Sequence, residues 1–341
     1  MVEGHWDKPV RNQENDSCCM DLTSKSSTQI QMSEMHVLVF AMTNSQKQNI
    51  VLYSFIGDAL SLGPHWIYDQ EEIASKAGEI TGYLDPISEY HPGKKAGDFT
   101  HYGDQATVLL ESIADLNRFD LEDFAQSWME FWETEGKESY QDGATKTTLQ
   151  NLKDGKPTKQ CASNSHDLAG AARATPLFLL DWDSDDDLVA AVKEQTRFTH
   201  DHAEVIAAGE FFCRVALEVA TGANIPGALK NAAARAWESL PKEWLALPQE
   251  GQVRNEDPLA AAKEVGLTCH VSHAFQVCCD LLLRYPDDPT LALITNARVG
   301  GDSAARGLVL GMIYGASPEP KPLPKAWMDE LSVELSIEEG S

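Results

Sequence analysis

The chain has 341 residues, which is enough for one large domain or two ordinary ones. Hydrophobic residues make up 43% of it and charged residues 23%, so it can bury a core, and a wholly disordered chain is excluded. Acidic residues outnumber basic ones by 53 to 27, which gives a net charge of −26. Because such a surface repels phosphate groups and anionic lipids, we predict that neither nucleic acid nor a membrane is a partner.

Residues 1–46 are rich in Ser, Gln, Asn and Thr and show no sustained apolar period, so we expect them to be disordered or poorly ordered. From about residue 48, apolar residues recur at intervals of three and four, as at Ile50, Tyr53 and Ile56, and this spacing predicts helices. Further helices are expected at 109–116, 121–131 and 201–219, and from near residues 167, 186, 226, 271, 289 and 302.

Alternating strand patterns are almost absent, so the sequence predicts a single all-α domain over 47–317, followed by an acidic tail at 318–341. Gly307, Gly311 and Gly315 lie four residues apart on one face of the last predicted helix, and we expect a second helix to approach them closely. The seven cysteines show no C-x-x-C spacing, and no secretory signal is recognised before them. We therefore expect a reducing, cytoplasmic location.

Three junctions between loops and helices carry polar residues with chemical potential. Asp58 follows Gly57 inside an amphipathic helix, where a buried carboxylate needs a partner. The segment T-H-Y-G-D-Q at 100–105 lies just before a helix. The segment G-G-D-S-A-A-R at 300–306 has glycines that allow close backbone approach and places Asp302 at a helix start. Taken singly, each is a common helix-capping pattern.

Together and in this order, these segments resemble the ADP-ribosylglycohydrolase family, which includes DraG-type enzymes and the J1 crystallins. The likeness extends from about residue 50 to 317. The matching segments are G-D-A-L at 57–60, Y-G-D-Q-A at 102–106, D-L-A-G-A-A-R-A-T-P-L at 167–177, T-H-D-H-A at 199–203 and G-G-D-S-A-A-R-G at 300–307. The resemblance implies an orthogonal bundle of many helices, in agreement with the all-α pattern.

The resemblance also implies an activity. In the family, Asp and Thr residues of the first and last motifs hold two Mg²⁺ ions, which bind ribose hydroxyls and organise the attack of water on the anomeric carbon. Hard cations require oxygen ligands, which is why carboxylates gather there. The bond that breaks is an N- or O-glycosidic link of an ADP-ribosyl or related ribosyl group, so the implied partner is a small molecule or an ADP-ribosylated protein. No oligomeric state is predicted.

This sequence departs from the family at the metal ligands. Asp104 and Asp302 remain, but Gln105 replaces the second Asp of the first motif, and Ala304 and Ala305 replace ligands of the last. Because two carboxylates cannot balance two divalent ions in a partly dry pocket, we expect the two-magnesium site to be lost. A single Mg²⁺ on Asp104 and Asp302, with Gln105 as a neutral ligand, is the form of the site that would remain.

Several residues near the motifs are candidates for new roles. Histidine is a general base near neutral pH, and Arg306 would either hold an anionic part of the substrate or pair with Asp302 in a structural ion pair. The candidate catalytic residues are Asp104, Asp302, His101 and His200. The candidate substrate-binding residues are Asp58, His65, Tyr102, Gly103, Gln105, Arg173, Gly300, Gly301, Ser303 and Arg306.

Two functions are open at this point. One is a divergent hydrolase of the family, which requires Asp104 and Asp302, almost two hundred positions apart, to meet at the mouth of one helical bundle. The other is a catalytically inactive, J1-crystallin-like binding or structural protein that kept the bundle and lost the chemistry. An Arg306 side chain that filled and sealed the cleft would favour the second.

Overall fold

The computed structural model describes residues 42–254 and 256–332, and every statement about structure refers to these residues. They form α-helices and short 3₁₀-helices with no strand, apart from two isolated bridges, so the predicted all-α class is confirmed. The helices in the first half of the chain are α1 (Asn44–Leu62), α2 (Gln70–Ala77), α3 (His101–Leu116), α4 (Leu121–Glu133), η1 (Glu135–Glu138), α5 (Gly143–Lys153), η2 (Thr158–Gln160), α6 (Ala169–Ala172) and η3 (Thr175–Leu179).

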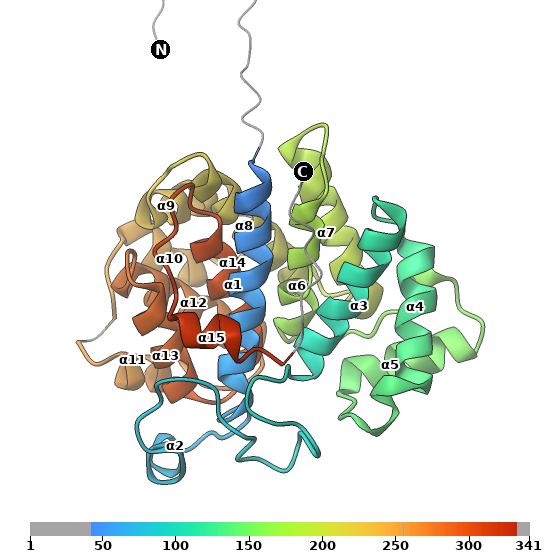
Figure 1. Ribbon diagram of the computed structural model, residues 1–341. Coiled ribbons are helices and arrows are strands. Elements are labelled where there is room, and N and C mark those ends of the chain that lie inside the picture. The colour runs from blue at the N-terminus through green and yellow to red at the C-terminus, as the bar shows by residue number, and fades with distance from the viewer. Residues whose placement is uncertain (1–41, 255, 333–341) are drawn as a thin grey trace, which may run out of the picture. The chain divides into compact units, whose positions relative to one another are not determined.

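The remaining helices are α7 (Asp185–Thr199), α8 (Ala203–Ala220), α9 (Ile225–Arg235), η4 (Ala236–Glu238), α10 (Lys242–Glu250), α11 (Pro258–Val265), α12 (Val271–Arg284), α13 (Pro289–Val299), α14 (Ser303–Gly315) and α15 (Lys325–Asp329). Figure 1 shows α3, α4 and α5 gathered on one side of α1, and α9 to α13 on the other. None of the described helices is both long enough and apolar enough to span a membrane.

Helix α1 packs against α14 with their backbones in direct contact. A methyl group added at Gly57 would overlap the carbonyl oxygen of Gly307, and one added at Gly311 would overlap that of Tyr53. Gly315 stands in the same relation to the backbone of Asn49. The spacing of glycines therefore predicted a close helix contact correctly, and this contact fixes how the ends of α1 and α14 meet.

The two ends of the described chain are packed more extensively than the sequence suggested. Thr43 and Gln46 form a capping box that starts α1 at Asn44, before the expected boundary at residue 47. After residue 317, Leu323 and Trp327 are buried, and the Trp327 indole donates a hydrogen bond to the carbonyl oxygen of Thr81 at 3.0 Å. The packed chain thus continues to α15. Residues 1–41, which hold most of the predicted N-terminal tail, and residues 333–341, the last part of the predicted C-terminal tail, lie outside the described residues.

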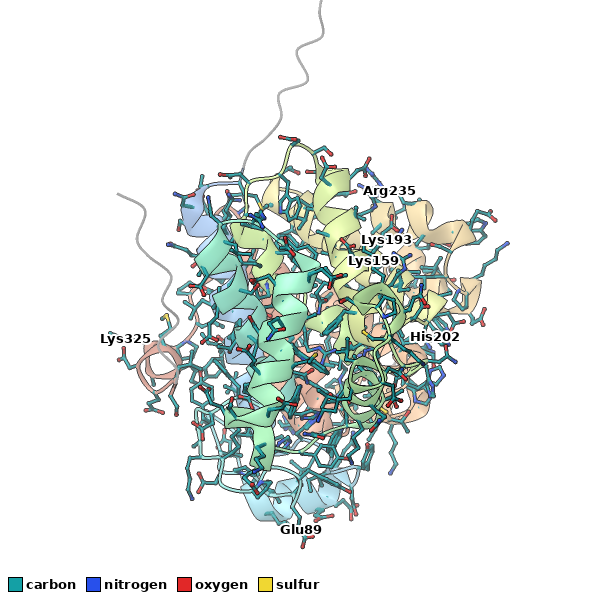
Figure 2. The ribbon with its side chains drawn as sticks, turned by 90° about the vertical axis from the view of Figure 1, so that its right-hand side faces the viewer. Glu89, Lys159, Lys193, His202, Arg235 and Lys325 are labelled. Carbon is teal, nitrogen blue, oxygen red and sulfur yellow. The ribbon has the colours of Figure 1, made fainter. Side chains whose placement is uncertain are left out.

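Basic side chains on one face of the protein pair with carboxylates. Figure 2 labels Lys159, Lys193 and Arg235, which come from η2, α7 and α9. Lys159 lies 2.9 Å from Glu194, and Lys193 lies 2.7 Å from Glu210. On this strongly acidic chain, such ion pairs neutralise these positive charges locally, so the labelled lysines do not form a basic patch.

We predict that Gly311→Ala destabilises the protein by about 1–3 kcal/mol or more, because the new methyl group meets backbone that cannot rotate away. Urea unfolding measures the change. Gly143→Ala is the matched control: a methyl group there meets nothing within 4 Å, and Gly143 is exposed at the start of α5. The control should keep or slightly increase stability. Equal stability of the two variants would contradict the close packing of α1 against α14.

Candidate functional site

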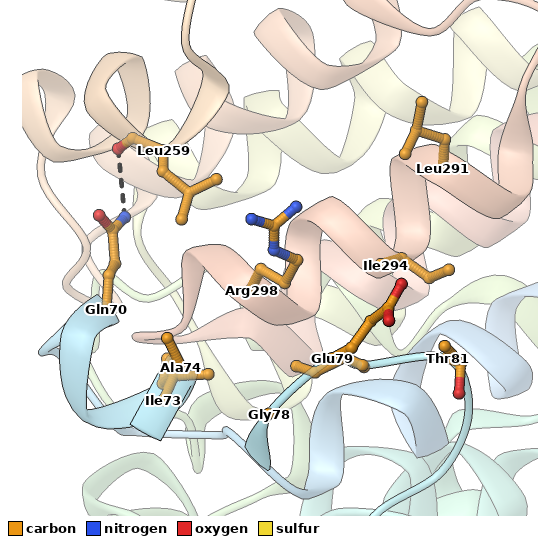
Figure 3. Close-up of a pocket in the computed structure, with 11 residues that line it drawn as sticks. Gln70, Ile73, Ala74, Gly78, Glu79, Thr81, Leu259, Leu291, Ile294 and Arg298 are labelled. Atoms are coloured by element: carbon orange, nitrogen blue, oxygen red, sulfur yellow. Dashed lines mark hydrogen bonds between the residues drawn. The ribbon is translucent and has the colours of Figure 1, made fainter. Parts of the chain in front are cut away.

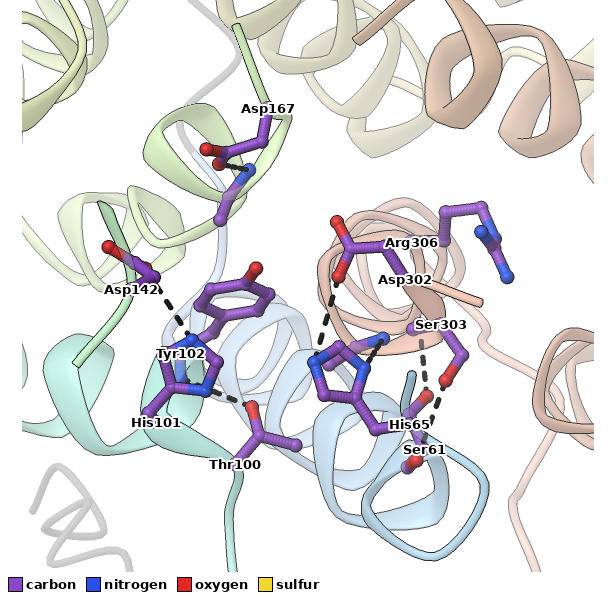
Figure 4. Close-up of polar contacts among 12 residues, drawn as sticks. Ser61, His65, Thr100, His101, Tyr102, Asp142, Asp167, Asp302, Ser303 and Arg306 are labelled. Atoms are coloured by element: carbon purple, nitrogen blue, oxygen red, sulfur yellow. Dashed lines mark hydrogen bonds and ion pairs between the residues drawn. The ribbon is translucent and has the colours of Figure 1, made fainter. Parts of the chain in front are cut away.

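The site forms where the C-terminal end of α1 meets the N-terminal ends of α3 and α14. His65 lies in the turn after α1, His101 and Tyr102 lie in the first turn of α3, and Asp302 precedes α14. Figure 4 shows these side chains facing one another. Sequence segments separated by more than two hundred residues are thus brought together by the contact between α1 and α14.

Backbone hydrogen bonds lock the two loops of the site to each other. The Trp66 amide donates to the carbonyl of Gly301 at 2.8 Å, and the Gly301 amide donates to the carbonyl of Ile67 at 2.7 Å. Gly300 and Gly301 both have positive φ, and a side chain at Gly301 would overlap the carbonyl oxygen of Leu267. These two predicted binding residues therefore shape the loop that carries Asp302, through a backbone conformation that other residues rarely adopt.

Asp302 is fully buried, and neither of its carboxylate oxygens has a partner with normal hydrogen-bond geometry. The Nε2 atom of His65 lies 3.7 Å from its Oδ1 atom. Burial raises the pKa of Asp302 to about 7, and the carboxylates of Asp167 and Asp142 add to the rise, while Arg306 and the Tyr102 hydroxyl oppose it. Asp302 is therefore an uncompensated acid at the centre of the site.

The other two carboxylates are held by partners. Asp142 accepts a hydrogen bond from the Thr145 amide at 2.6 Å, and its Oδ2 atom lies 3.5 Å from Nε2 of His101. Burial pushes the pKa of Asp142 upward, but His101 and Arg173 outweigh it and hold this pKa well below its ordinary value. Asp142 is thus held in its charged form, whereas Asp302, with a pKa of about 7, changes its protonation state near neutral pH.

Asp167 is also held by hydrogen bonds and by a histidine. It pairs with Nε2 of His200 at 2.9 Å and accepts hydrogen bonds from the Ser165 hydroxyl at 2.6 Å and the Ala169 amide at 3.1 Å. Burial raises the pKa of Asp167, but His200 overcomes this and leaves the pKa below its ordinary value. In Figure 4 the Tyr102 hydroxyl points toward the space between Asp142, Asp167 and Asp302. Its own pKa is raised well above the ordinary value, first by burial and then by these three carboxylates.

Asp104 is engaged elsewhere. Lys94 donates hydrogen bonds to both of its carboxylate oxygens, at 2.7 and 2.8 Å. No hydrogen bond or ion pair among the described residues joins Asp104 to Asp302, and the charges that weigh most on Asp302 are those of Asp167, Arg306 and Asp142. The structure therefore pairs Asp104 with Lys94 and leaves the Asp302 carboxylate without a hydrogen bond.

Asp58 links α1 to the start of α3 through hydrogen bonds. Its two oxygens accept hydrogen bonds from the Thr100 amide and the Thr100 hydroxyl, both at 2.7 Å, and Thr100 caps the start of α3. A side chain at Gly103 would overlap the Asp58 carboxylate. The structure thus gives Asp58 and Gly103, both predicted to bind substrate, contacts that position His101 and Tyr102.

Three further predicted residues form a buried network behind the site. Gln105 accepts hydrogen bonds from Arg173 and from the Trp128 indole, the latter at 2.9 Å, and donates to the His101 carbonyl at 2.8 Å. Arg173 also donates to the Thr199 hydroxyl, which lies 2.8 Å from Nδ1 of His200. Both ring nitrogens of His200 are therefore occupied, and the network supports His101 and Asp167 from behind.

Arg306 is buried beneath the loop rather than in an open cleft. Its Nε atom donates to Asn296 at 2.9 Å, and its Nη2 atom donates to the carbonyl oxygen of Gly300 at 2.5 Å. No described ion pair joins it to Asp302, although its charge lowers the pKa of that acid. Ser303 is buried as well, and its carbonyl oxygen accepts from Asn296 and Ser61. Arg306 thus binds Asn296 and Gly300 within the protein, while its Nη1 atom is buried without a hydrogen-bond partner.

Aromatic rings surround the histidines of the site. Trp66 stacks on His65 with ring centroids 4.6 Å apart and meets the edges of Tyr90 and Tyr140, each at 4.9 Å. Trp66 is a rare non-glycine residue with positive φ, a conformation that costs energy and is common at ligand sites. Tyr90 leaves 44% of its surface exposed. The aromatic group therefore reaches from the buried histidines to solvent.

Sequence reasoning did not list several side chains of this site as candidates, among them His91, Lys94, Tyr140 and Asp142. His91 and Lys94 lie in the irregular segment between α2 and α3, which has no periodic signal. Asp142 precedes Gly143 at a helix start and looks like an ordinary cap, which it also is. The H-P-G-K-K run at 91–95, polar and close to the T-H-Y-G-D-Q motif, was the one available signal.

The magnesium ion implied by the resemblance does not fit these residues. Lys94 binds both oxygens of Asp104, and the amide oxygen of Gln105 already accepts hydrogen bonds from Trp128 and Arg173. Of the oxygen donors expected to hold Mg²⁺, only the carboxylate of Asp302 is left without a partner. One carboxylate does not provide the oxygen cage that this hard cation needs.

A separate cleft lies away from these residues. It has a volume of about 450 Å³ and lies between α2, α11 and α13, with Gln70, Ile73 and Arg298 on its walls (Figure 3). It shares no residue with the site described above. The volume of this cleft alone therefore does not make it the candidate functional site.

The comparisons with known proteins agree with the fold and motifs. The model of the ADP-ribosylglycohydrolase family matches residues 48–339, and the chain belongs to this family. One solved structure, an ADP-ribosylglycohydrolase-related protein complex, superimposes with a TM-score of 0.66 at 18% identity, covering 84% of this chain and 92% of the other. At that identity the likeness shows the fold alone. No curated protein matches the sequence.

We predict that Lys94→Met lowers stability by about 1–3 kcal/mol at about pH 8, because it leaves Asp104 without its partner. Burial raises the pKa of Asp104, and Lys94 lowers it. Without Lys94 this pKa rises further above the unfolded value, so the loss should be small near pH 4 and grow as the pH rises through the folded-state pKa. Thermal unfolding across this range measures it.

Lys95→Met is the matched control, because Lys95 pairs with Asp85 at 3.4 Å while both side chains stay largely exposed. Its effect should remain within about 0.5 kcal/mol at every pH. A Lys94→Met loss that does not depend on pH would contradict the assignment of the pair.

We also predict that about 10 mM Mg²⁺ leaves the melting temperature of the protein unchanged, because a cation that binds the folded state raises this temperature by mass action. Thermal unfolding with Mg²⁺, and with the same ionic strength of NaCl, makes the comparison. A saturable rise with Mg²⁺ alone would restore a magnesium site.

Proposed function

We propose that this protein is a hydrolase that releases ADP-ribose or a related ribosyl group from an N- or O-glycosidic bond. Membership of the ADP-ribosylglycohydrolase family supports a glycohydrolase of some kind. The observation that carries the proposal is the Asp302 carboxylate, which is buried without a hydrogen-bond partner and faces Tyr102 and His65. A buried acid that the fold does not satisfy is suited to exchange a proton with a ligand.

The three carboxylates would have different roles in the reaction, because their hydrogen-bond partners differ. Asp142 and Asp167 are held by hydrogen bonds and remain negative, so they favour the positive charge that develops on a ribosyl carbon as its glycosidic bond breaks. Asp302 would accept the proton of the attacking water, because it is the carboxylate without other partners. Tyr102, whose hydroxyl lies among all three, would orient the water or a ribose hydroxyl.

The aromatic group would contribute to substrate binding. Tyr90 and Tyr68 are about half exposed, and Trp66 connects Tyr90 to the buried histidines. Flat, partly exposed rings next to polar groups bind the faces of sugars or bases. Such a surface fits a ribosyl substrate that carries a base, whether free or attached to a protein.

One observation favours the alternative, an inactive, J1-crystallin-like binding or structural protein. The Lys94–Asp104 pair and the buried Gln105 network put internal contacts where the family binds metal. A protein that had lost catalysis would tolerate such contacts. The activity of Asp302 variants separates the two proposals.

We predict that the protein releases ADP-ribose from proteins modified on arginine or serine, and that Asp302→Asn lowers kcat by about 10²–10⁴-fold, the usual contribution of general acid–base catalysis. Chromatography of the released nucleotide measures the rate. Asp183→Asn, a change at an exposed aspartate in the loop before α7, is the matched control and should keep full activity.

Calorimetric titration with ADP-ribose completes the test. No release by the wild-type protein on either linkage, together with binding of ADP-ribose, would replace the hydrolase by a binding protein. Neither release nor binding would favour the structural role. A rate that Asp302→Asn leaves unchanged would remove Asp302 from the reaction.

A further inference from the structure

Three buried histidines converge at the site from three separate segments. His65 follows α1, His91 lies in the loop between α2 and α3, and His101 begins α3. None of the three exposes more than 5% of its surface. One ligand atom from each lies within 4.8 Å of the ligand atoms of the other two, and the ring centroids are 5.3, 5.6 and 6.1 Å apart.

Four nitrogens of these rings lack a hydrogen bond, while Nδ1 of His65 accepts one from the Ala304 amide at 3.4 Å. Nε2 of His65, Nε2 of His91 and both nitrogens of His101 are buried without a hydrogen bond. Burying an unsatisfied polar atom costs about 1–3 kcal/mol, and here several such atoms point at one another. Packing alone gives no reason for this arrangement, whereas a shared ligand would satisfy all three rings.

The surrounding charge selects a cation. Oδ1 of Asp302 lies 3.7 Å from Nε2 of His65, and Oδ2 of Asp142 lies 3.5 Å from Nε2 of His101. These groups present lone pairs and negative charge and so repel an anion. A carboxylate behind a histidine is also the common outer partner of a metal-binding imidazole.

The donor types select the kind of cation. Imidazole nitrogen suits zinc and the neighbouring divalent transition metals, while magnesium and calcium prefer oxygen. Two ligand atoms of a tetrahedral zinc lie about 3.4 Å apart, given bonds of about 2.1 Å. The 3.7 Å between Nε2 of His65 and Oδ1 of Asp302 is close to this spacing. The histidine ligand atoms lie within 4.8 Å of one another, so on binding an ion their widest pair would close by at most about 1.4 Å.

We propose that His65, His91 and His101 bind one divalent transition-metal ion of the zinc class, with Asp302 facing its remaining position. The Trp66 and Tyr102 rings shield His65 at centroid distances of 4.6 and 5.6 Å, which keeps water from the ligands. The site differs from the magnesium site of the family in its ligands and in the metal it selects. It goes beyond the proposed hydrolysis, because it concerns binding in the absence of any substrate.

The test measures metal binding to the full chain. Metals are first removed with a chelator, and Zn²⁺ or Co²⁺ is then added in excess. We expect about one equivalent of the added metal to stay bound through gel filtration, and bound Co²⁺ to show the intense visible bands of a four- or five-coordinate ion. X-ray absorption of the zinc form should show imidazole ligands at about 2.0–2.1 Å. Substoichiometric metal, or the weak spectrum of six-coordinate Co²⁺, would overturn the proposal.

Variants locate the site. His91→Gln should weaken Zn²⁺ binding at least tenfold in competition with a chromophoric chelator and abolish the rise in melting temperature that Zn²⁺ gives the wild-type protein. His273→Gln is the matched control, because His273 lies outside the cluster, with its Nδ1 atom 2.7 Å from the Thr268 hydroxyl. Equal losses in the two variants would place the metal elsewhere.

Circular dichroism of the metal-free forms shows whether His91→Gln is folded. If it is not, the ligand types and bond lengths of the wild-type zinc form decide the question alone. Metal binding without release of ADP-ribose would overturn the proposed hydrolysis and leave the metal site standing, and release without stoichiometric metal would do the reverse.

Discussion

The contact between the backbones of α1 and α14 sets the geometry on which the site depends. Gly57 and Gly311 leave no room for a methyl group against the opposing helix, so the two helices lie as close as their backbones allow. That distance brings the turn after α1 to the loop before α14, where Trp66 and Gly301 exchange backbone contacts. His65 and Asp302 face each other because the helices behind them cannot separate without losing this packing.

Around this frame, polar side chains at the start of α3 are bound by contacts within the protein. Lys94 supplies a positive charge at Asp104, and Gln105 joins Arg173 and Trp128 in a buried hydrogen-bond network. These contacts provide hydrogen-bond partners for Asp104 and Gln105 within the protein itself. The carboxylate of Asp302 has no such partner, so the unsatisfied polar groups of the site are this acid and the histidines near it.

Local patterns in the sequence were enough for the helices, for the glycine face of α14 and for the family, because each depends on residues a few positions apart. The inward direction of particular polar side chains was not predictable in the same way. Arg306 and Arg173 were expected to bind substrate, and the fold shows that each also donates hydrogen bonds to buried protein groups, which for Arg173 come from distant segments. His91 lies in a segment without periodicity, and only the folded chain shows that it meets His65.

The unsatisfied polar atoms bear on whether the site is a remnant or in use. Buried nitrogens and oxygens of His65, His91, His101 and Asp302 have no hydrogen bonds, although the network immediately behind them is almost fully paired. At about 1–3 kcal/mol for each such atom, the folded state bears a large cost at one place. A purely structural protein would gain stability by filling this place with apolar side chains. Because several of these atoms belong to groups that converge on one point, a ligand that satisfies them is the simplest physical account of the arrangement.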